Sequence, residues 1–302
     1  MEKETLGTLL VICTAIISGF AIPVNKFLII DLDPVIFTVI RAIIIAVGFF
    51  ILASFQNKFD YKKFKKVSWK YLLAIGFVGG GLAFLLYFTG LKLTTSGRAA
   101  FLHKTLPLYV VILAFLFLKE KITRKQIVAI CLMFLGTLLL YESKIKPTEL
   151  WSNPSFGDLL VIIATFCWAV ENVIARATMI KGESNFVVTF ARMFFGAMFL
   201  FAAVILLNKF DELLTLTPEQ VGKLLISASI LFGYVLTWYW GIKLINVSKA
   251  APLLLLSPVI SLVLGVIWFN EPIPSLQILG SILILVGAYI ISRVRSEFVT
   301  GV

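Results

Sequence analysis

Long apolar runs separated by short polar connections dominate the chain. Ten runs of about 20 residues each are found at 6–29, 34–55, 70–91, 96–118, 124–141, 157–180, 185–207, 221–242, 248–269 and 275–292. Each run is long enough to cross ~30 Å of hydrocarbon at about 1.5 Å per residue. Lipid offers no hydrogen-bond partners to the backbone, and the runs do not alternate strictly between apolar and polar residues. The pattern therefore predicts ten transmembrane helices.

Composition supports the same fold class. The chain has 302 residues, of which 60% are hydrophobic and 14% are charged, whereas a soluble domain carries about 25% charged residues. A soluble fold could not hide so much apolar surface, so we expect an all-α integral membrane protein. Cys13, Cys131 and Cys167 lie inside predicted spans. Neither a disulfide framework nor a metal site is indicated, and no cofactor is expected.

The distribution of positive charge predicts the orientation. In a soluble protein a net charge of +11 would suggest nucleic acid as a partner. Here most lysines and arginines lie in connections on one side of the membrane, above all 56–70 and 119–125. By the positive-inside rule this side, with both termini, is cytoplasmic. We expect a multi-pass protein of the cytoplasmic membrane that binds no nucleic acid; an alternative role for Lys62–Lys66 is contact with anionic lipid or a partner.

The two halves of the chain are copies. A shift of 150 to 151 residues aligns rare polar and small residues of one half with the same types in the other. The matches are GTLLVI at 7–12 with GDLLVI at 157–162, Arg41 with Arg192, Lys92 with Lys243, Pro107 with Pro258, Glu120 with Glu271, Gln126 with Gln277 and Gly136 with Gly287. We divide the chain into a five-helix repeat at 1–146, a linker at 147–156 and a second five-helix repeat at 157–302.

An odd number of spans per repeat requires the second copy to be inverted in the membrane. The charges agree, because KEKITRK after the fourth span is strongly basic and its counterpart after the ninth, NEPIPSL, has no positive charge. Alternating-access transporters are built from inverted repeats, with the substrate site near the midplane between them. This architecture is the strongest functional signal in the sequence.

Several of these features together resemble a known family. The chain is similar to EamA-type members of the drug/metabolite transporter superfamily in its five-plus-five helices, in Arg41 and Arg192 early in the second helix of each half, and in the segments AAFLHKTLPLYVVILAFLFLKE and APLLLLSPVISLVLGVIWFNE. The resemblance implies a central cavity lined mainly by helices 1, 3, 4, 6, 8 and 9. It also implies export or exchange of small organic metabolites without an ATP-hydrolysing domain. The expected partners are a small solute and membrane lipid, with a homodimer as a further candidate.

His103 and Lys104 interrupt the apolar fourth span. Their counterparts in the ninth span are Leu254 and Leu255, so the repeat does not require them. In one interpretation both face the cavity, where Lys104 attracts a carboxylate or phosphate and His103 exchanges a proton near neutral pH. In the other, Lys104 forms a buried salt bridge and His103 a hydrogen bond to a neighbouring helix. Adjacent helical residues point about 100° apart, so we expect only one of them to face the cavity fully.

Glu171 and Asn172 form a second polar pair, in the sixth span, where the first repeat is apolar. An acid inside a span needs a partner or a water-filled cavity. Glu171 is therefore either the counter-ion of a buried cation or a proton carrier. Trp168 and Tyr87 also lie deep in their spans and are candidate cavity walls.

Other polar residues suggest structural roles. The symmetric positions of Arg41 and Arg192 favour a structural function, such as binding backbone carbonyls at broken helix ends. The resemblance suggests that Glu120 and Glu271, at helix ends, are structural glutamates that bind backbone N–H groups of a loop or cap the next helix.

Prolines and glycines mark places where helices bend or approach closely. Pro107 and Pro258 remove a backbone donor at matched positions and predict paired flexible points. Gly80, in the run 79–81, allows close helix contact or a local break. The aromatic run Trp238–Trp240 is typical of a membrane-interface belt.

The features together predict a secondary active transporter or exporter of small organic metabolites, with proton coupling as an option. The excess of cations over acids in the spans favours an anionic or zwitterionic solute, such as an amino acid or organic acid. One alternative is an exporter of lipophilic cations, for which Glu171 is essential and Lys104 dispensable. A distant alternative is a membrane enzyme acting on lipid, but the sequence shows no metal-binding acidic cluster or nucleophile set, and we expect no enzyme. A non-transporting assembly or receptor protein would have no evident use for inverted repeats.

Overall fold

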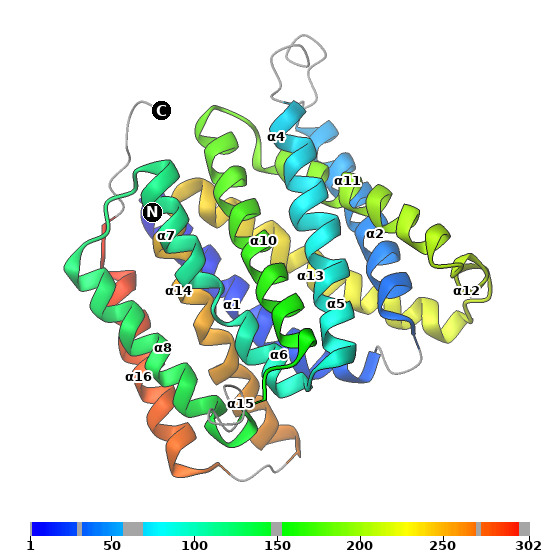
Figure 1. Ribbon diagram of the computed structural model, residues 1–302. Helices are drawn as coiled ribbons and strands as arrows, with labels where there is room; N and C mark the ends of the chain where they lie inside the picture. The colour runs from blue at the N-terminus through cyan, green and yellow to red at the C-terminus, as the bar shows by residue number, and fades with distance from the viewer. Residues whose placement is uncertain (1, 29–31, 57–68, 146–152, 270–272, 296–302) are drawn as a thin grey trace.

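The computed structural model describes residues 2–28, 32–56, 69–145, 153–269 and 273–295. Within these ranges all regular secondary structure is helical. Ten helical stretches are long and apolar enough to cross a membrane. The ten predicted spans are thus confirmed, and they pack into one helical bundle (Figure 1).

The first five spans run from α1 to α8. Their elements are α1 (Lys3–Leu28), α2 (Pro34–Phe55), α4 (Trp69–Ala74), the π-helix η1 (Ile75–Leu82), α5 (Ala83–Leu93), α6 (Ser96–His103), α7 (Leu106–Leu118) and α8 (Arg124–Ile145). The third span consists of α4, η1 and α5 in direct succession. The fourth span consists of two pieces, α6 and α7.

The second five spans run from α10 to α16. Their elements are α10 (Phe156–Ile180), α11 (Asn185–Leu206), α13 (Pro218–Leu244), α14 (Val247–Leu253), the 3-10 turn η2 (Leu254–Leu256), α15 (Ser257–Phe269) and α16 (Ser275–Ser292). A short helix, α12 (Phe210–Leu214), lies in the connection between α11 and α13. The ninth span consists of α14, η2 and α15.

Capping residues determine where several spans begin. Asp33 accepts a hydrogen bond from the backbone N–H of Val35 at 2.8 Å, and Pro34 occupies the first turn of α2. At the start of α10, Ser155 and Asp158 form a reciprocal capping box. These side chains satisfy backbone donors that have no partner inside the helix. The span starts therefore follow from local sequence.

Glycines bring the third span unusually close to its neighbours. A Cβ added at Gly79 would overlap Cγ of Glu171 on α10. A Cβ added at Gly80 would overlap the backbone oxygen of Arg192 on α11. The same residues lie in the π-helical η1. Close contact and a local departure from α-helix, expected as alternatives, occur together.

The fourth and ninth spans are interrupted at matching points. A turn at 104–105 separates α6 from α7, and η2 separates α14 from α15. Pro107 and Pro258 follow the breaks, and neither can donate to the preceding turn. The hydroxyl groups of Thr105 and Ser257 instead donate to the carbonyl three residues back, at 2.6 and 2.8 Å. The irregular backbone therefore lies just before each proline.

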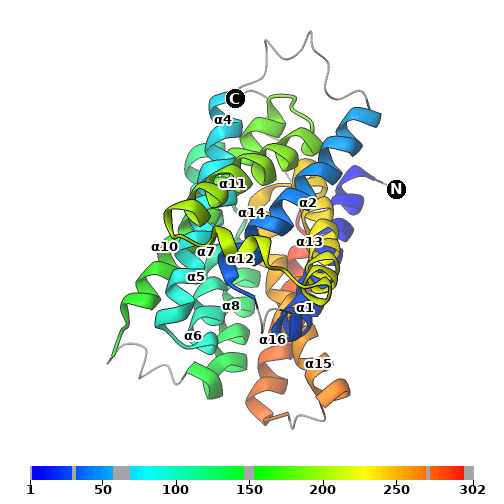
Figure 2. The ribbon, with the colours of Figure 1, turned by 90° about the vertical axis from the view of Figure 1, so that its right-hand side faces the viewer.

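Helices of the two halves pack against one another across the bundle. Helix α2 contacts α11, α8 contacts α16, α1 contacts α13 and α15, and α10 contacts α5 and α7. Helices α8 and α16 lie side by side at one edge, away from α2 and α11 (Figures 1 and 2). The start of α1 and the end of α16 lie at the same end of the bundle (Figure 1). Outer faces carry exposed apolar side chains such as Ile112, Phe117 and Leu206, as lipid contact requires.

Candidate functional site

A cavity of about 210 Å³ lies between the two halves of the chain. Its lining residues are Ser18, Ala21, Asn25, Arg41, Phe84, His103, Leu106, Trp168, Glu171, Asn172, Arg192, Ile230, Leu231, Tyr234 and Trp238. Spans 1, 3, 4, 6 and 8 contribute, as the family resemblance implied. None of these residues comes from the described part of span 9, whereas spans 2 and 7 contribute Arg41 and Arg192.

Glu171 on α10 is the central acid of this cavity. Its side chain is 1% exposed, and one carboxylate oxygen lies 3.6 Å from Nε of Arg192. The other accepts a hydrogen bond from the hydroxyl group of Tyr239. The Arg192 guanidinium also lies 5.8 and 5.9 Å from the ring centroids of Phe84 and Tyr239. Glu171 is therefore the counter-ion of Arg192, and Arg192 contacts a carboxylate rather than the backbone carbonyls expected from the sequence.

Asn172 connects α10 to α13. Its amide group donates to the backbone oxygen of Trp168 at 2.8 Å and accepts from Nε1 of Trp238 at 2.7 Å. Nε1 of Trp168 donates in turn to the backbone oxygen of Gly79 at 3.0 Å. These bonds hold both indole rings in the cavity wall.

The aromatic run of α13 has a different role from the one expected. Trp238 and Tyr239 are 3% and 1% exposed, and only Trp240 is exposed. The prediction of an interface belt is wrong for the first two residues, because their polar atoms find partners on α10 inside the bundle.

His103 lies among aromatic rings at the end of α6. Its ring centroid lies 4.9 Å from that of Trp168 and 5.7 Å from that of Tyr87. Its Nδ1 atom is buried and has no hydrogen-bond partner among the described residues. His103 and Trp168 line the cavity, whereas Tyr87 packs behind them and is not part of the lining. The hydrogen bond to a neighbouring helix, expected in one interpretation, is not formed by Nδ1.

Lys104 does not line the cavity. Its Nζ donates to Oγ of Ser257 at 2.9 Å. This bond joins the break in the fourth span to the break in the ninth. Neither the cavity position nor the salt bridge expected from the sequence is found for Lys104 in the described part of the chain, because the turn after His103 directs its side chain toward α15.

Arg41 is a buried cation of the cavity that no acid of the described residues compensates. Its Nη1 donates to Oγ of Ser227 at 3.1 Å, and that hydroxyl group donates to Oδ1 of Asn25 at 2.7 Å. The guanidinium lies 4.0 Å from the ring centroid of Phe37. Among the described residues no carboxylate pairs with Arg41, and its Nε is buried without a hydrogen-bond partner. The positively charged guanidinium group of Arg41 thus faces the cavity, and its Nε–H donor has no acceptor among the described residues.

Ser227 and Asn25, the partners of Arg41, were not among the residues expected from the sequence. Asn25 was detectable as an amide within the first apolar run, although it lies close to the end of that run. Ser227 gives no signal, because serine is common in transmembrane helices and can bond its own backbone. Within the described residues, no group of three or more His, Cys, Asp or Glu side chains could hold a metal ion.

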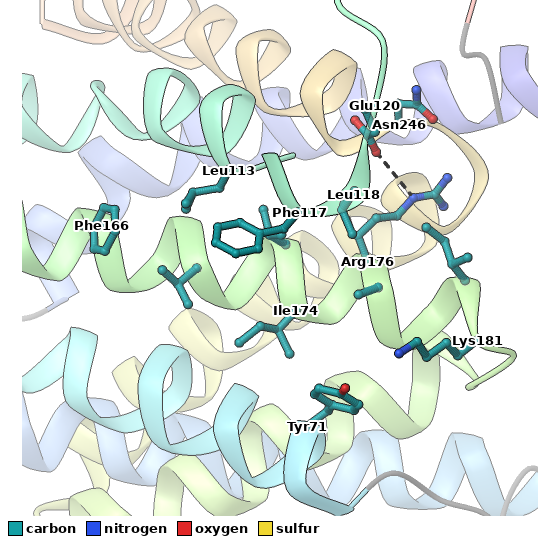
Figure 3. Close-up of a pocket in the computed structure, with 14 residues that line it drawn as sticks. Tyr71, Leu113, Phe117, Leu118, Glu120, Phe166, Ile174, Arg176, Lys181 and Asn246 are labelled. Atoms are coloured by element: carbon teal, nitrogen blue, oxygen red, sulfur yellow. Dashed lines mark ion pairs between the residues drawn. The ribbon is translucent and has the colours of Figure 1, made fainter. Parts of the chain in front are cut away.

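Glu120 joins α7 to the start of α14 at the end of the bundle predicted to be cytoplasmic. Its carboxylate accepts from the backbone N–H groups of Val247 and Ser248 at 3.1 and 3.0 Å, and from Oγ of Ser248 at 2.5 Å. Nε of Arg176 lies 4.0 Å away (Figure 3). Glu120 thus binds backbone N–H groups, as expected, but those of the ninth span rather than of a loop or the next helix. Glu271, its counterpart, lies outside the described residues.

The opposite end of the bundle carries its own acidic clusters. Asp158 accepts from the hydroxyl group of Thr94 at 2.5 Å and lies 2.9 Å from Nη2 of Arg98. Asp33 pairs with Lys209, and Lys92 lies 3.7 Å away. Burial raises the pKa of Asp33, but the hydrogen bond from Lys209, the backbone N–H of Val35 and the positive charge of Lys209 outweigh burial, so the pKa lies below its ordinary value.

Comparisons with known proteins find relatives that are named as transporters. The chain is 30% identical over 211 residues to "Uncharacterized transporter YyaM" of Bacillus subtilis (strain 168), an alignment that covers 69% of this chain and 68% of that protein. It is 27% identical over 281 residues to an "Uncharacterized transporter" of Archaeoglobus fulgidus, covering 92% and 95%. It is 27% identical over 231 residues to a "Probable amino-acid metabolite efflux pump" of Salmonella typhimurium, covering 73% and 74%.

Fold and family are shown by two further comparisons. A crystal structure of a protein with 18% sequence identity has a TM-score of 0.75 and covers 94% of this chain and 95% of that chain, so the two share a fold. The model of the EamA-like transporter family matches residues 5–142 and 155–293. These matches take up most of the sequence, and the chain therefore belongs to the EamA-like transporter family.

Proposed function

We propose that the protein is a secondary active transporter of the cytoplasmic membrane that exports or exchanges a small carboxylate-bearing solute, with amino acids favoured. The observation that carries this proposal is Arg41, a buried guanidinium in the central cavity that has no acid partner among the described residues. Away from water, a guanidinium is stabilised most strongly by a carboxylate or phosphate that accepts two parallel hydrogen bonds. A solute carboxylate would provide this partner.

The rest of the lining suits the ammonium group of an amino acid. A cation is attracted to a carboxylate and to the faces of aromatic rings. Glu171 lines the cavity together with Phe84, Trp168 and Trp238. Relatives from Salmonella typhimurium and Escherichia coli, 27% and 25% identical, are named probable amino-acid metabolite efflux pumps. We infer a zwitterion bound with its carboxylate at Arg41 and its ammonium group toward Glu171.

Alternating access between inverted repeats is supported by the packing of the helices. In the proposed repeats, spans 1, 3 and 4 correspond to spans 6, 8 and 9. A contact between spans 1 and 8 should therefore be matched by one between spans 6 and 3. A contact between spans 1 and 9 should likewise be matched by one between spans 6 and 4. Both members of each pair are present. Contacts 2–7 and 5–10 map onto themselves and are also present. Such symmetry lets one repeat rock against the other around a central site.

The ion clusters at the two ends are the gates in this proposal. Arg98 of the first repeat corresponds to Lys249 of the second. Arg98 lies 2.9 Å from Asp158 near the start of the sixth span, and Lys249 lies 3.0 Å from Glu4 near the start of the first. Related contacts thus stand at opposite ends of the bundle. Opening one cluster at a time would expose the cavity to one side of the membrane.

His103 is the proposed proton carrier for coupling. A histidine ring can take up and release a proton, and Nδ1 of His103 is buried without a partner in the described structure. Glu171 is the other candidate, but its oxygens already contact Arg192 and Tyr239. A His103→Gln variant should exchange solute across proteoliposomes but lose acceleration by a pH gradient. An unchanged gradient response would exclude His103 as the carrier.

The test of the solute class is counterflow of labelled amino acids and organic acids into proteoliposomes. We expect wild type to move at least one zwitterion and Arg41→Gln to lose about 10- to 150-fold in apparent affinity, since a hydrogen bond to a charged group contributes about 1.5–3 kcal/mol. Arg124→Gln, an exposed arginine at the start of α8, is the matched control and should be unaffected. Equal affinities of wild type and Arg41→Gln would refute the proposal.

A lipophilic cation is the second candidate solute. The rings of Phe84, Trp168 and His103 beside Glu171 favour it, because aromatic faces and an acid attract cations. In that case Glu171→Gln should abolish transport while Arg41→Gln leaves it intact. The two variants therefore separate the two solute classes in one assay.

A further inference from the structure

A groove on α10 is separate from the central cavity and shares no lining residue with it. Its volume is about 510 Å³, within the range of roughly 300–1,000 Å³ typical of small-molecule sites. It runs along α10 between α7 and α4 (Figure 3). The side chains that line most of its length are apolar: Leu113, Phe117, Phe166, Val170, Ile174 and Ile180. Phe117 and Phe166 are 66% and 46% exposed, so the groove opens to the lipid side.

One end of the groove is strongly basic. Tyr71 and Lys181 line this end together (Figure 3). The ring centroid of Tyr71 lies 5.0 Å from Nζ of Lys181 and 5.1 Å from Nζ of Lys70. Both lysines are exposed. The groove therefore combines an apolar channel with the ammonium group of Lys181 in its lining and that of Lys70 beside Tyr71.

The other charged residues of the groove are already engaged. Glu120 binds the backbone N–H groups at the start of α14. Arg176 donates to two carbonyls near the end of α13 at 2.8 Å and lies near Glu120. The ammonium group of Lys181 in the lining and that of Lys70 beside Tyr71 therefore dominate the charge that a ligand meets at this end of the groove.

We propose that this groove binds one anionic glycerophospholipid of the cytoplasmic leaflet, with its phosphate between Lys70 and Lys181 and an acyl chain along α10. Phe166 on α10 and Lys181, the residue that follows its last turn, are 15 residues apart, or about 22 Å. This length exceeds the ~15 Å of hydrocarbon in one leaflet, so the channel accommodates an acyl chain. The basic end lies on the side that the positive-inside rule assigns to the cytoplasm, where anionic lipids attract lysines.

Other occupants fit the groove less well. A soluble anion would leave the apolar channel unused, and a zwitterionic lipid would give the two lysines no net negative charge. A second copy of the chain would have to bring an acid to the basic mouth. The lipid proposal goes beyond the transport function and does not depend on it.

Native mass spectrometry of the full-length protein in detergent tests the proposal. Wild type is titrated with phosphatidylglycerol or with phosphatidylcholine of the same acyl chains. We expect the first phosphatidylglycerol to bind at least tenfold more tightly than phosphatidylcholine. Lys70→Gln with Lys181→Gln should remove this preference. Lys125→Gln with Arg295→Gln removes two exposed positive charges elsewhere and should retain it.

A second pair of variants tests the acyl channel. Ala177 lines the groove, so Ala177→Phe should weaken binding of both lipids. Ala202→Phe places the same ring on an exposed position of α11 and should leave binding unchanged. Thermal unfolding of each variant shows that it is folded.

Several results would overturn the proposal. Equal affinity of wild type for the two lipids, or a preference that survives loss of both lysines, would refute the headgroup site. Equal competition by glycerol phosphate would identify a site for a soluble anion. A dimer that Ala177→Phe dissociates would identify a second copy of the chain as the occupant.

Discussion

At the scale of single residues, several side chains and glycines of this bundle make contacts so close that a substitution would disrupt them. The pair Glu171–Arg192 is buried on both sides, and the loss of hydration of two such charges is offset only by good geometry and further hydrogen bonds. Tyr239 provides one of these bonds. Gly79 allows the backbone of the third span to lie directly against Glu171. The charge pair and the glycine contact therefore depend on each other.

Gly80→Ala is expected to destabilise the protein. The added methyl group would overlap the backbone oxygen of Arg192 and crowd Gly196, and overpacking costs about 1–3 kcal/mol or more. The expected result is a lower thermal unfolding midpoint in detergent and weaker solute binding. Gly222→Ala is the control, because nothing lies within 4 Å of its added Cβ. This helical position should gain about 0.5–1 kcal/mol. Equal midpoints for the two variants would contradict the close contact.

Prediction from sequence at this scale succeeded for some residues and failed for others. The cavity lining contains His103, Trp168, Glu171 and Asn172, which were recognisable as polar or aromatic residues deep in a span. Lys104 was equally recognisable but contacts Ser257 instead. Sequence indicates depth in the membrane, whereas the direction of a side chain around its helix depends on backbone breaks and neighbouring helices.

At the scale of elements, capping residues determine where helices begin, and prolines determine where helices are interrupted. The starts of α2 and α10 are readable from the sequence, because Asp33 and Ser155 cap the backbone locally. The breaks in the fourth and ninth spans were expected from Pro107 and Pro258. At the ninth span the hydroxyl group of Ser257 donates to the carbonyl of Leu254, which Pro258 leaves without its helical N–H donor. At the fourth span the hydroxyl group of Thr105 donates to the carbonyl of Leu102 within the turn.

Asp33→Asn tests the electrostatic part of one cap. Because the pKa of Asp33 in the folded protein lies below its ordinary value near 3.8, its ionisation stabilises the folded state above that value. This stabilisation is lost as the pH falls through the folded pKa. Wild type should therefore exceed Asp33→Asn in unfolding free energy at pH 7, and the difference should shrink as the pH falls toward 3. Asp211→Asn, at an exposed position of α12, serves as control. A difference independent of pH would refute the ion pair with Lys209.

At the scale of the whole molecule, contacts between residues far apart in the sequence join helices to one another at each end of the bundle, and a cavity lies between these ends. Glu120 and Lys249 connect α14 to α7 and α1, and Asp158 connects α10 to the third and fourth spans. Contacts between halves repeat in pairs. A rocking motion would break one set of end contacts while preserving the other.

Cross-linking one proposed gate should stop transport. In a variant without the native cysteines, Glu4→Cys and Lys249→Cys would be joined by a short bifunctional thiol reagent, since the native side chains lie 3.0 Å apart. Counterflow should cease on cross-linking and return when the link is cleaved. The control is Glu219→Cys with Lys223→Cys, one turn apart on α13, which should transport with or without the link. Full transport by the cross-linked Glu4–Lys249 variant would show that this contact does not open.

The ten spans and the polar residues that lie inside them were determined by the sequence alone, because hydrophobic length and rare polar positions can be read residue by residue. Tertiary structure alone decided which polar groups meet. Glu171 pairs with Arg192 rather than Lys104, and Arg41 faces the cavity without an acid partner in the part of the chain that the structure describes. These partnerships depend on the rotation and close approach of helices, which glycines and broken backbone control and which hydrophobicity does not encode.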